Sequence, residues 1–286
     1  MPDAPTVAEL LSRARSLGVD RLDAQCLLAF ALSRSRSWLL AHGDARVAAA
    51  DVGTLWPLLQ RRAAGEPLAY LVGEREFHGL KLHVNPDVLV PRSDTETLVD
   101  WAIELMAAED RPLVVDLGTG SGAIALALKQ ACPQADVHAS DNSAAALALA
   151  RDNGSRLGLR VSWHLGDWWH ALADSPARRF DLAVANPPYI AVGDPHLAAL
   201  CHEPRVALVP SGDAADGLAD LERLIRGAPR HLHPGGWLLL EHGFDQGAAV
   251  RQRLQASGFC ELETRADLGG RARVTGGRSP GAAAWL

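Results

Sequence analysis

The chain has 286 residues, 48% of them hydrophobic, and a formal net charge of −6. This length and composition allow one large domain, or a medium and a small one, and they exclude a disordered protein. The charge argues against a protein that coats nucleic acid, and no apolar run reaches the roughly 20 residues of a membrane span. The four scattered cysteines show no metal-ligand spacing and no secretion signal is apparent, so we expect a cytoplasmic protein without a metal.

The first segment, residues 7 to about 75, is rich in Ala, Leu and Arg. Its apolar residues recur at the spacing of a helix face, as at Leu10, Ala14 and Leu17. Glycines such as Gly18 and Gly43 divide it into several short helices. We therefore predict a small helical domain over residues 1–75.

Residues 76–92 change to an alternating pattern in which Leu80, Leu82 and Val84 are apolar. The alternation is typical of strands, and Asn85-Pro86-Asp87 is a turn sequence. We predict a β-hairpin connector whose turn lies at Asn85–Asp87.

From residue 93 onward, apolar runs of strand length alternate with helical patterns. This alternation predicts an α/β domain over residues 93–286, with a parallel, doubly wound sheet. Ser93 or Asp94 is the expected N-cap of its first helix. The predicted strands are residues 113–116, 136–141, 161–165, 180–185 and 237–241, and the predicted helices are 95–106, 124–130, 144–157, 218–231 and 247–256.

The sequence Asn186-Pro187-Pro188-Tyr189 follows the predicted strand 180–185 directly. Proline cannot continue a ladder, so the strand ends there, and the carboxyl ends of strands are where open α/β sheets bind ligands. A carboxamide oxygen and a neighbouring carbonyl can accept both hydrogens of a planar NH2 group, while an aromatic ring stacks on its plane. The motif predicts a site for an amide or an exocyclic amine, and the alternative is a simple turn.

A glycine-rich loop lies between the predicted strand 113–116 and the helix that follows it. Its glycines let the backbone approach a ligand closely at a helix start. The acidic residue at its beginning would repel a pyrophosphate, and it suits a ligand with an ammonium or sulfonium group. The expected cofactor-binding residues here are Asp116, Gly118, Thr119, Gly120, Ser121 and Gly122.

Acidic residues end the next two predicted strands. Asp141 is placed to accept hydrogen bonds from ribose hydroxyls, although it is alternatively the N-cap of the next helix. Asp167 is placed to accept from an adenine amine and Trp168 to cover the ring, although Trp168 is alternatively a packing residue, as we expect of Trp163 and Trp169. Together with the glycine loop these residues imply S-adenosylmethionine, giving S-adenosylhomocysteine as product, with the methyl group facing Asn186.

At this point the chain resembles the class I methyltransferases, and closely the peptide chain release factor N5-glutamine methyltransferases. The likeness extends over nearly the whole chain. The motifs that carry it are Gly65–Leu71, Arg75–Phe77, Val90–Glu96, Asp116–Gly122, Asn186–Tyr189, Leu240–Gly243 and Arg273–Gly276.

The resemblance implies a Rossmann-like seven-stranded methyltransferase sheet whose last two strands form an antiparallel hairpin. It also implies that the substrate is the glutamine of the Gly-Gly-Gln loop in class 1 release factors. Asn186 Oδ1 and the Pro187 carbonyl would accept its two N–H groups, Tyr189 would stack on the amide, and Pro188 would complete the substrate site. Ser93 departs from the proline that the family often has there.

Three alternatives stay open. Cys201-His202-Glu203-Pro204 is similar to a segment of the ribosomal-protein glutamine methyltransferases. An enzyme acting on the exocyclic N6 amine of adenine would use the same Asn-Pro-Pro-Tyr motif but needs a basic groove. A non-catalytic binder has no use for an amide clamp. We expect a monomer that contacts release factors through its helical segment, with no membrane and no direct nucleic acid partner.

Overall fold

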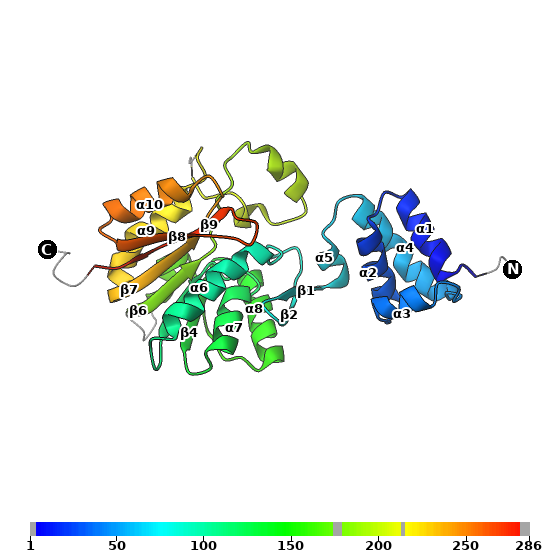
Figure 1. Ribbon diagram of the computed structural model, residues 1–286, viewed down its shortest axis with the longest axis horizontal. Helices are drawn as coiled ribbons and strands as arrows, with labels where there is room; N and C mark the ends of the chain where they lie inside the picture. Colours follow the sequence, from blue (N-terminus) through cyan, green and yellow to red (C-terminus); the bar gives the residue numbers. More distant parts are fainter. Residues whose placement is uncertain (1–3, 174–178, 213–214, 281–286) are drawn as a thin grey trace. The chain divides into compact units, whose positions relative to one another are not determined.

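The computed structural model describes residues 4–173, 179–212 and 215–280. The chain divides into two compact units, residues 1–74 and 75–286 (Figure 1). Every residue that lines the cavities described below belongs to the second unit.

The first unit is helical, as its apolar spacing predicts. Its helices are α1 (Val7–Ser16), α2 (Arg21–Ala31), α3 (Arg36–Ala41), α4 (Ala49–Ala63) and α5 (Leu68–Val72). A reciprocal capping box between Thr6 and Glu9 begins α1. Leucines from several helices form its core, among them Leu10, Leu27 and Leu59, which are each at most 1% exposed.

A hairpin of β1 (Glu74–Phe77) and β2 (Leu80–His83) follows. Our prediction of its turn at Asn85-Pro86-Asp87 is wrong. The turn is His78-Gly79, where φ is +47° and +76°, as the tightest two-residue hairpin turns require. The segment Asn85–Asp87 follows β2 and makes a local turn, in which the Asp87 N–H donates to Asn85 Oδ1 at 3.0 Å.

The second unit contains the predicted seven-stranded sheet, with strand order β5-β4-β3-β6-β7-β9-β8. Its first five strands are parallel, and β9 is antiparallel to both β7 and β8. The strand order reverses between β3 and β6, which is where such sheets bind ligands. The strands are β3 (Leu113–Leu117), β4 (Asp136–Asp141), β5 (Ser162–Leu165), β6 (Phe180–Ala185), β7 (Leu232–Glu241), β8 (Cys260–Ala266) and β9 (Ala272–Arg278).

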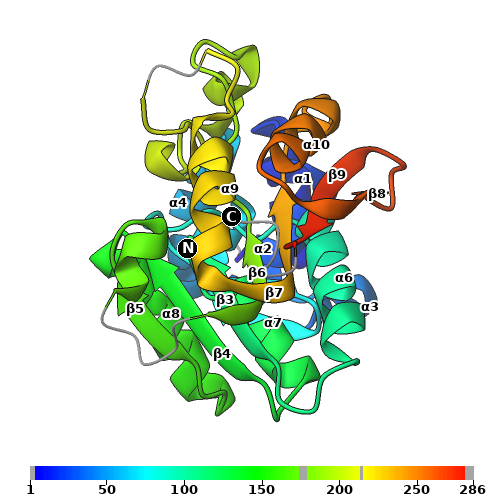
Figure 2. The same ribbon diagram turned by 90° about the vertical axis from the view of Figure 1, so that its left-hand side faces the viewer.

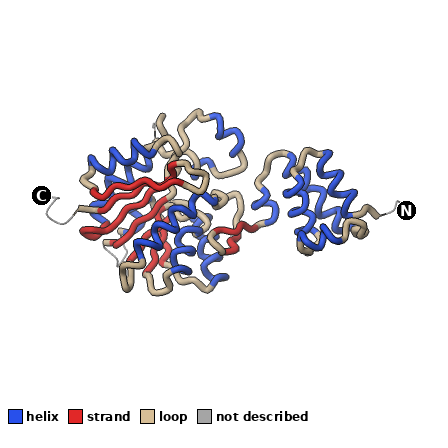
Figure 3. The backbone as a smooth tube through the Cα atoms, viewed as in Figure 1, coloured by secondary structure: helices blue, strands red, loops and turns tan. Residues whose placement is uncertain are grey.

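Helices cover both faces of this sheet, so that it forms a middle layer (Figure 3). Figure 2 shows α6 (Glu96–Met106), α7 (Ala123–Ala131) and α8 (Ala144–Leu157) on one face, and α9 (Ala219–His231) and α10 (Gly247–Ala256) on the other. Alternate strand residues supply the two cores, as β-strand pleating demands. No helix within the described ranges is long and apolar enough to cross a membrane.

The observed element boundaries agree with the predicted ones to within one residue except at the start of β7, and the predicted N-cap of α6 differs as well. β7 begins at Leu232, five residues before the predicted start, because an irregular register lets Leu232 pair with Phe180 ahead of Trp237. Neither Ser93 nor Asp94 caps α6, because a 3₁₀ turn over Ser93–Thr95 precedes it. Asp94 instead forms an ion pair with Arg273 at 3.1 Å.

Candidate active site

The glycine-rich loop joins the end of β3 to the start of α7. Gly118, Gly120 and Gly122 all have positive φ, between +56° and +84°, a range that glycine adopts without steric cost. The N–H groups of Gly118 and Thr119 both donate to the Ser140 carbonyl at 2.9 Å, and Gly120 N–H donates to Asp141 Oδ2 at 2.8 Å. The end of β4 therefore fixes the shape of the loop.

Asp116 lies beneath this loop, fully buried, and not among the residues that line the cavity described below. Its Oδ2 accepts a hydrogen bond from the Thr119 hydroxyl at 2.6 Å, while Oδ1 has no hydrogen-bond partner among the described residues. Burial raises the pKa of this carboxyl to about 7. Asp116 thus holds Thr119 in place from beneath the loop.

Asp141 connects the glycine loop to α8. Besides Gly120, its carboxylate accepts from the Ser143 N–H at 2.8 Å, and Ser143 is the N-cap of α8. The alternative that Asp141 caps this helix is therefore wrong. Burial raises the pKa of Asp141, which lines the cavity.

Trp168 packs directly over the glycine loop. A Cβ atom added to Gly118 would lie 2.8 Å from its Cζ3, so the ring occupies the space that a side chain there would need. Its Nε1–H donates to Asp220 Oδ1 at 3.3 Å, and the neighbouring Asp167 forms an ion pair with Arg223. One oxygen of Asp167 is thus already engaged.

The two tryptophans assigned to packing do pack. Trp169 is 5% exposed and donates from Nε1 to the Leu224 carbonyl at 3.0 Å, while Trp163 packs against Gly122 and Gly154. Gly122 is therefore a close-packing glycine that does not line the cavity.

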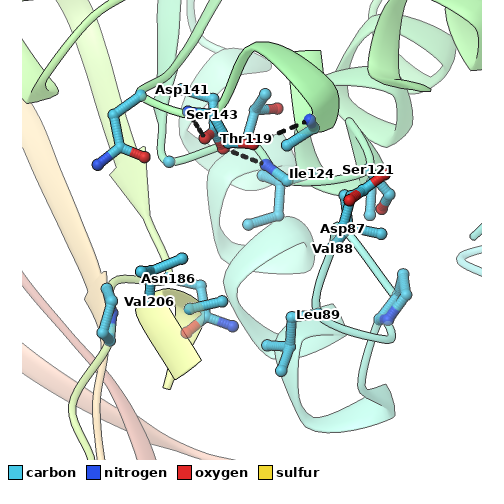
Figure 4. A pocket seen from close by; sticks show the side chains of 18 of the residues that line it. Asp87, Val88, Leu89, Thr119, Ser121, Ile124, Asp141, Ser143, Asn186 and Val206 are labelled. Carbon is cyan, nitrogen blue, oxygen red and sulfur yellow. Dashed lines mark hydrogen bonds between the residues drawn. The ribbon is translucent and has the colours of Figure 1, made fainter. Parts of the chain in front are cut away.

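An open cavity of about 1120 Å³ lies above the glycine loop (Figure 4). Asp87, Val88 and Leu89 form one of its walls, although the local pattern predicts that Asp87 lies in a hairpin turn. Arg92, Thr95, Ser143 and Val206 also line it. Arg92 and Thr95 belong to the Val90–Glu96 motif, whereas no local sequence signal marked Ser143 or Val206. The predicted site residues that line this cavity are Gly118, Thr119, Gly120, Ser121, Asp141, Asp167, Trp168, Asn186 and Pro188.

A second cavity, of about 980 Å³, adjoins the first. Pro187, Tyr189 and Glu241 line it, and Asn186 lines both cavities. The Asn-Pro-Pro-Tyr motif therefore lies at the border between two spaces. The residues common to both linings are Leu89, Arg92, Asn186 and Ala207.

The side chains of this motif are held by specific hydrogen bonds. Asn186 Nδ2–H donates to Thr95 Oγ1 at 3.2 Å, which leaves Oδ1 as an acceptor. The Tyr189 hydroxyl donates to Glu241 Oε1 at 3.3 Å, and burial raises the pKa of this phenol, so it stays neutral. The Tyr189 carbonyl accepts from Gln246 Nε2 at 3.0 Å, which fixes the turn from its other side.

Glu241 and Arg273 form a buried charged cluster behind Tyr189. Glu241 is 1% exposed, and burial raises its pKa to about 7 although Thr95, Arg273 and Tyr189 oppose the rise. Arg273 is 9% exposed and donates from Nε and Nη2 to Asp267 Oδ2. Both residues lie in motifs that carry the family resemblance, but no local pattern marks a role for them, because only the fold brings their strand ends to Tyr189.

The first cavity fits S-adenosylmethionine by the chemistry of its lining. A Cβ atom at Gly120 would meet nothing within 4 Å, so the backbone there faces open space. Asp87, Asp141, Asp167 and Asp220 line the cavity against one arginine, which suits a cationic ligand and disfavours a phosphate. Asp141 provides an acceptor for hydroxyl groups and Trp168 a flat apolar ring. In the described part of the chain, no group of His, Cys, Asp and Glu side chains is arranged to hold a metal ion.

Comparisons with known proteins place these features in context. Residues 6–73 match the family model of the PrmC N-terminal domain, and residues 100–214 match that of the methyltransferase small domain. The chain is 49% identical, over 97% of its length and 99% of the relative's, to a release factor glutamine methyltransferase of Xylella fastidiosa. It is 51% identical to one of Bordetella pertussis, over 91% of this chain and 95% of the relative.

Solved structures add evidence on the fold alone. The N-terminal domain of human METTL16 in complex with SAH matches 76% of this chain and 82% of its own, with 17% identity and a TM-score of 0.54. A methyltransferase from Pyrococcus furiosus matches 71% of this chain and 90% of its own, with 17% identity and a TM-score of 0.51. Both similarities agree with the sheet topology described above.

Proposed function

This chain belongs to the release factor glutamine methyltransferase family, and we propose that it methylates the side-chain amide nitrogen, N5, of the glutamine in the Gly-Gly-Gln motif of class 1 peptide chain release factors. The methyl donor is S-adenosylmethionine. The observation that carries the proposal is the position of Asn186, which lines both cavities, so that a group bound in one can react with a group bound in the other.

The first cavity binds the cofactor in this proposal. S-adenosylmethionine supplies a methyl group made electrophilic by its positively charged sulfur. The glycine loop offers close backbone approach, Asp141 accepts from the ribose hydroxyls, and Trp168 covers the adenine. Asp116 contributes from beneath the loop, through the hydrogen bond that it accepts from Thr119. Because Asp167 is paired with Arg223, its assignment to the adenine amine depends on its second oxygen.

The second cavity holds the substrate amide. An amide nitrogen is a poor nucleophile because its lone pair is delocalised into the carbonyl. Asn186 Oδ1 and the Pro187 carbonyl accept the two N–H groups and aim the nitrogen at the methyl group, while Tyr189 stacks on the amide plane. Such alignment supplies roughly 7–11 kcal/mol of the barrier. As the new N–C bond forms, the bond from the methyl group to the sulfur would break and leave its electron pair on the neutral thioether S-adenosylhomocysteine. Both acceptors stabilise the positive charge on nitrogen, which then loses one proton to solvent.

The direct test is methyl transfer from labelled S-adenosylmethionine to a purified release factor. For Asn186→Ala we expect kcat to fall by roughly 10²- to 10³-fold, as for loss of one preorganised transition-state contact, with the cofactor Kd nearly unchanged. Tyr189→Phe keeps the ring and should retain most activity, whereas Tyr189→Ala should not. Equal losses of cofactor affinity and turnover in Asn186→Ala would assign this residue to the cofactor alone.

The same assay separates the alternative substrates. Ribosomal protein and oligonucleotide replace the release factor in parallel reactions, and a release factor with glutamate in place of the Gly-Gly-Gln glutamine is the matched control. Label on the wild-type factor alone supports the proposal. Label on the oligonucleotide that falls steeply with added salt would point to a nucleic-acid enzyme.

The remaining assignments concern organisation. The helical segment over residues 1–75 serves as the surface that recognises the release factor, residues 76–92 act as the connector, and residues 93–286 carry the chemistry. The match of residues 6–73 to a distinct family model supports a separate role for the first segment. The protein acts as a monomer in the cytoplasm, where its substrates are made.

A further inference from the structure

One charged group of the cofactor has no partner among the acidic residues of the first cavity. S-adenosylmethionine carries a carboxylate at the end of its methionine part, besides its sulfonium and ammonium groups. The four aspartates that line the cavity suit the two cationic groups and repel this anion. The carboxylate therefore needs hydrogen-bond donors or a positive charge from another part of the lining.

The glycine loop keeps its donors for the protein itself. The N–H groups of Gly118 and Thr119 both donate to the Ser140 carbonyl, and Gly120 N–H donates to Asp141. A loop that binds an anion instead turns such N–H groups toward the ligand. These three donors are therefore engaged and do not serve the carboxylate.

Arg92 supplies the positive charge. Among the described residues that line the first cavity, it is the single Lys, Arg or His. It also lines the second cavity, as Asn186 does. In the proposed arrangement the adenine lies at Trp168 and the ribose at Asp141, so the methionine part extends toward this border, where the methyl group is transferred.

A buried carboxylate holds Arg92 in place. Arg92 Nη2 forms an ion pair with Glu203 Oε1, and Glu203 Oε2 accepts from the Val90 N–H at 3.1 Å. The Glu203 side chain is 2% exposed and that of Arg92 is 41% exposed, so the pair is anchored in the protein at one end and accessible at the other. Nε and Nη1 of Arg92 donate to no residue in the described part of the chain. These donors remain for a ligand, and a planar guanidinium binds a carboxylate through two parallel N–H groups.

We propose that Arg92 binds the methionine carboxylate of S-adenosylmethionine and so lets the enzyme distinguish this cofactor from its decarboxylated form. The inference rests on the proposed function, because it takes the first cavity as the cofactor site. The decarboxylated form keeps the nucleoside, the sulfonium and the ammonium, so the two molecules differ only in the group that Arg92 binds. Holding this end of the methionine part also fixes the sulfur beside Asn186.

The experiment measures, by calorimetry, the Kd values of S-adenosylmethionine and of decarboxylated S-adenosylmethionine for the full chain. The ratio of the two Kd values should change by roughly 10- to 100-fold between the wild type and Arg92→Met, the effect of hydrogen bonds to a charged group. The change should come from weaker binding of S-adenosylmethionine, while the Kd of the decarboxylated form stays near that of the wild type and reports that the site is folded. Arg278→Met is the matched control, because Arg278 is 46% exposed, pairs with Glu261 at 2.9 Å and lines neither cavity. This control should keep the wild-type ratio.

Several results would overturn the inference. An equal change in both Kd values of Arg92→Met, or no change in either, would do so. A rise in KM for the release factor with both Kd values unchanged would assign Arg92 to the protein substrate instead. Arg92→Met leaves Glu203 buried without its cation, so if this variant does not fold, the double variant Arg92→Met/Glu203→Gln decides by the same ratio.

The wild-type chain separates this inference from the proposed function. Failure to bind S-adenosylmethionine would refute the cofactor site and the inference with it. The expected Kd ratios without methyl transfer to a release factor would refute the proposed function and support the inference.

Discussion

The contact between Gly118 and Trp168 gives a sharp test of the cofactor site. In Gly118→Ala the new Cβ lies 2.8 Å from Trp168 Cζ3, so the ring must retreat by about 0.6 Å to reach the 3.4 Å of ordinary contact. The backbone at φ +78° adds strain of roughly 1–2 kcal/mol for a residue with a Cβ. Loss of the hydrogen bond from Trp168 to Asp220 adds about 1 kcal/mol, so the free energy of unfolding should fall by roughly 2–3 kcal/mol.

Cofactor affinity should fall with the displaced ring. Loss of stacking between a base and an aromatic side chain costs roughly 1–3 kcal/mol, which is roughly 5- to 150-fold in Kd for S-adenosylmethionine. The control is Gly158→Ala, where φ is +67° but a Cβ would meet nothing within 4 Å. This variant carries the backbone strain alone, so calorimetry should give it a wild-type cofactor Kd. Equal Kd values for the two variants would refute the role of Trp168 as the cover of the cofactor ring.

Three further predictions concern the contacts of Glu203 with Val90 and Arg92, the buried Asp116 and the helical segment. In Glu203→Ala, loss of the ion pair with Arg92 and of the hydrogen bond from Val90 N–H at 3.1 Å should lower the unfolding free energy by about 1–3 kcal/mol in urea titrations. Asp116 has its pKa raised to about 7, so its stabilising effect is full below about pH 4 and is lost as the pH rises through 7. Asp116→Asn should therefore flatten this part of the stability profile in denaturation at several pH values, and an unchanged slope would contradict the assignment. Deleting residues 1–74 should raise KM for the release factor far more than KM for S-adenosylmethionine in steady-state kinetics, and equal changes would argue against a recognition role.

Local pattern determined the fold class and the outline of the site. The alternation of apolar runs placed each parallel strand, because a strand covered on both faces needs a continuous apolar run. The residues directly after β3, β4 and β6 were identifiable because the carboxyl ends of parallel strands meet at one edge of a sheet. Hence Gly118, Asp141 and Asn186 were found as separate signals and lie on one cavity.

Tertiary structure decided what supports and encloses these residues. The turn at His78-Gly79 was missed because Asn85-Pro86-Asp87 is the stronger turn sequence, and register selects between them only when the strands pair. Asp116 is buried under the loop, so its carboxyl does not reach the cavity. Asp167 pairs with Arg223, which is 56 residues away in the chain, so one of its oxygens is already engaged. The hydrogen bonds of Asn186 with Thr95 and of Tyr189 with Glu241 also join segments that are far apart in the sequence, and no local pattern encodes such contacts.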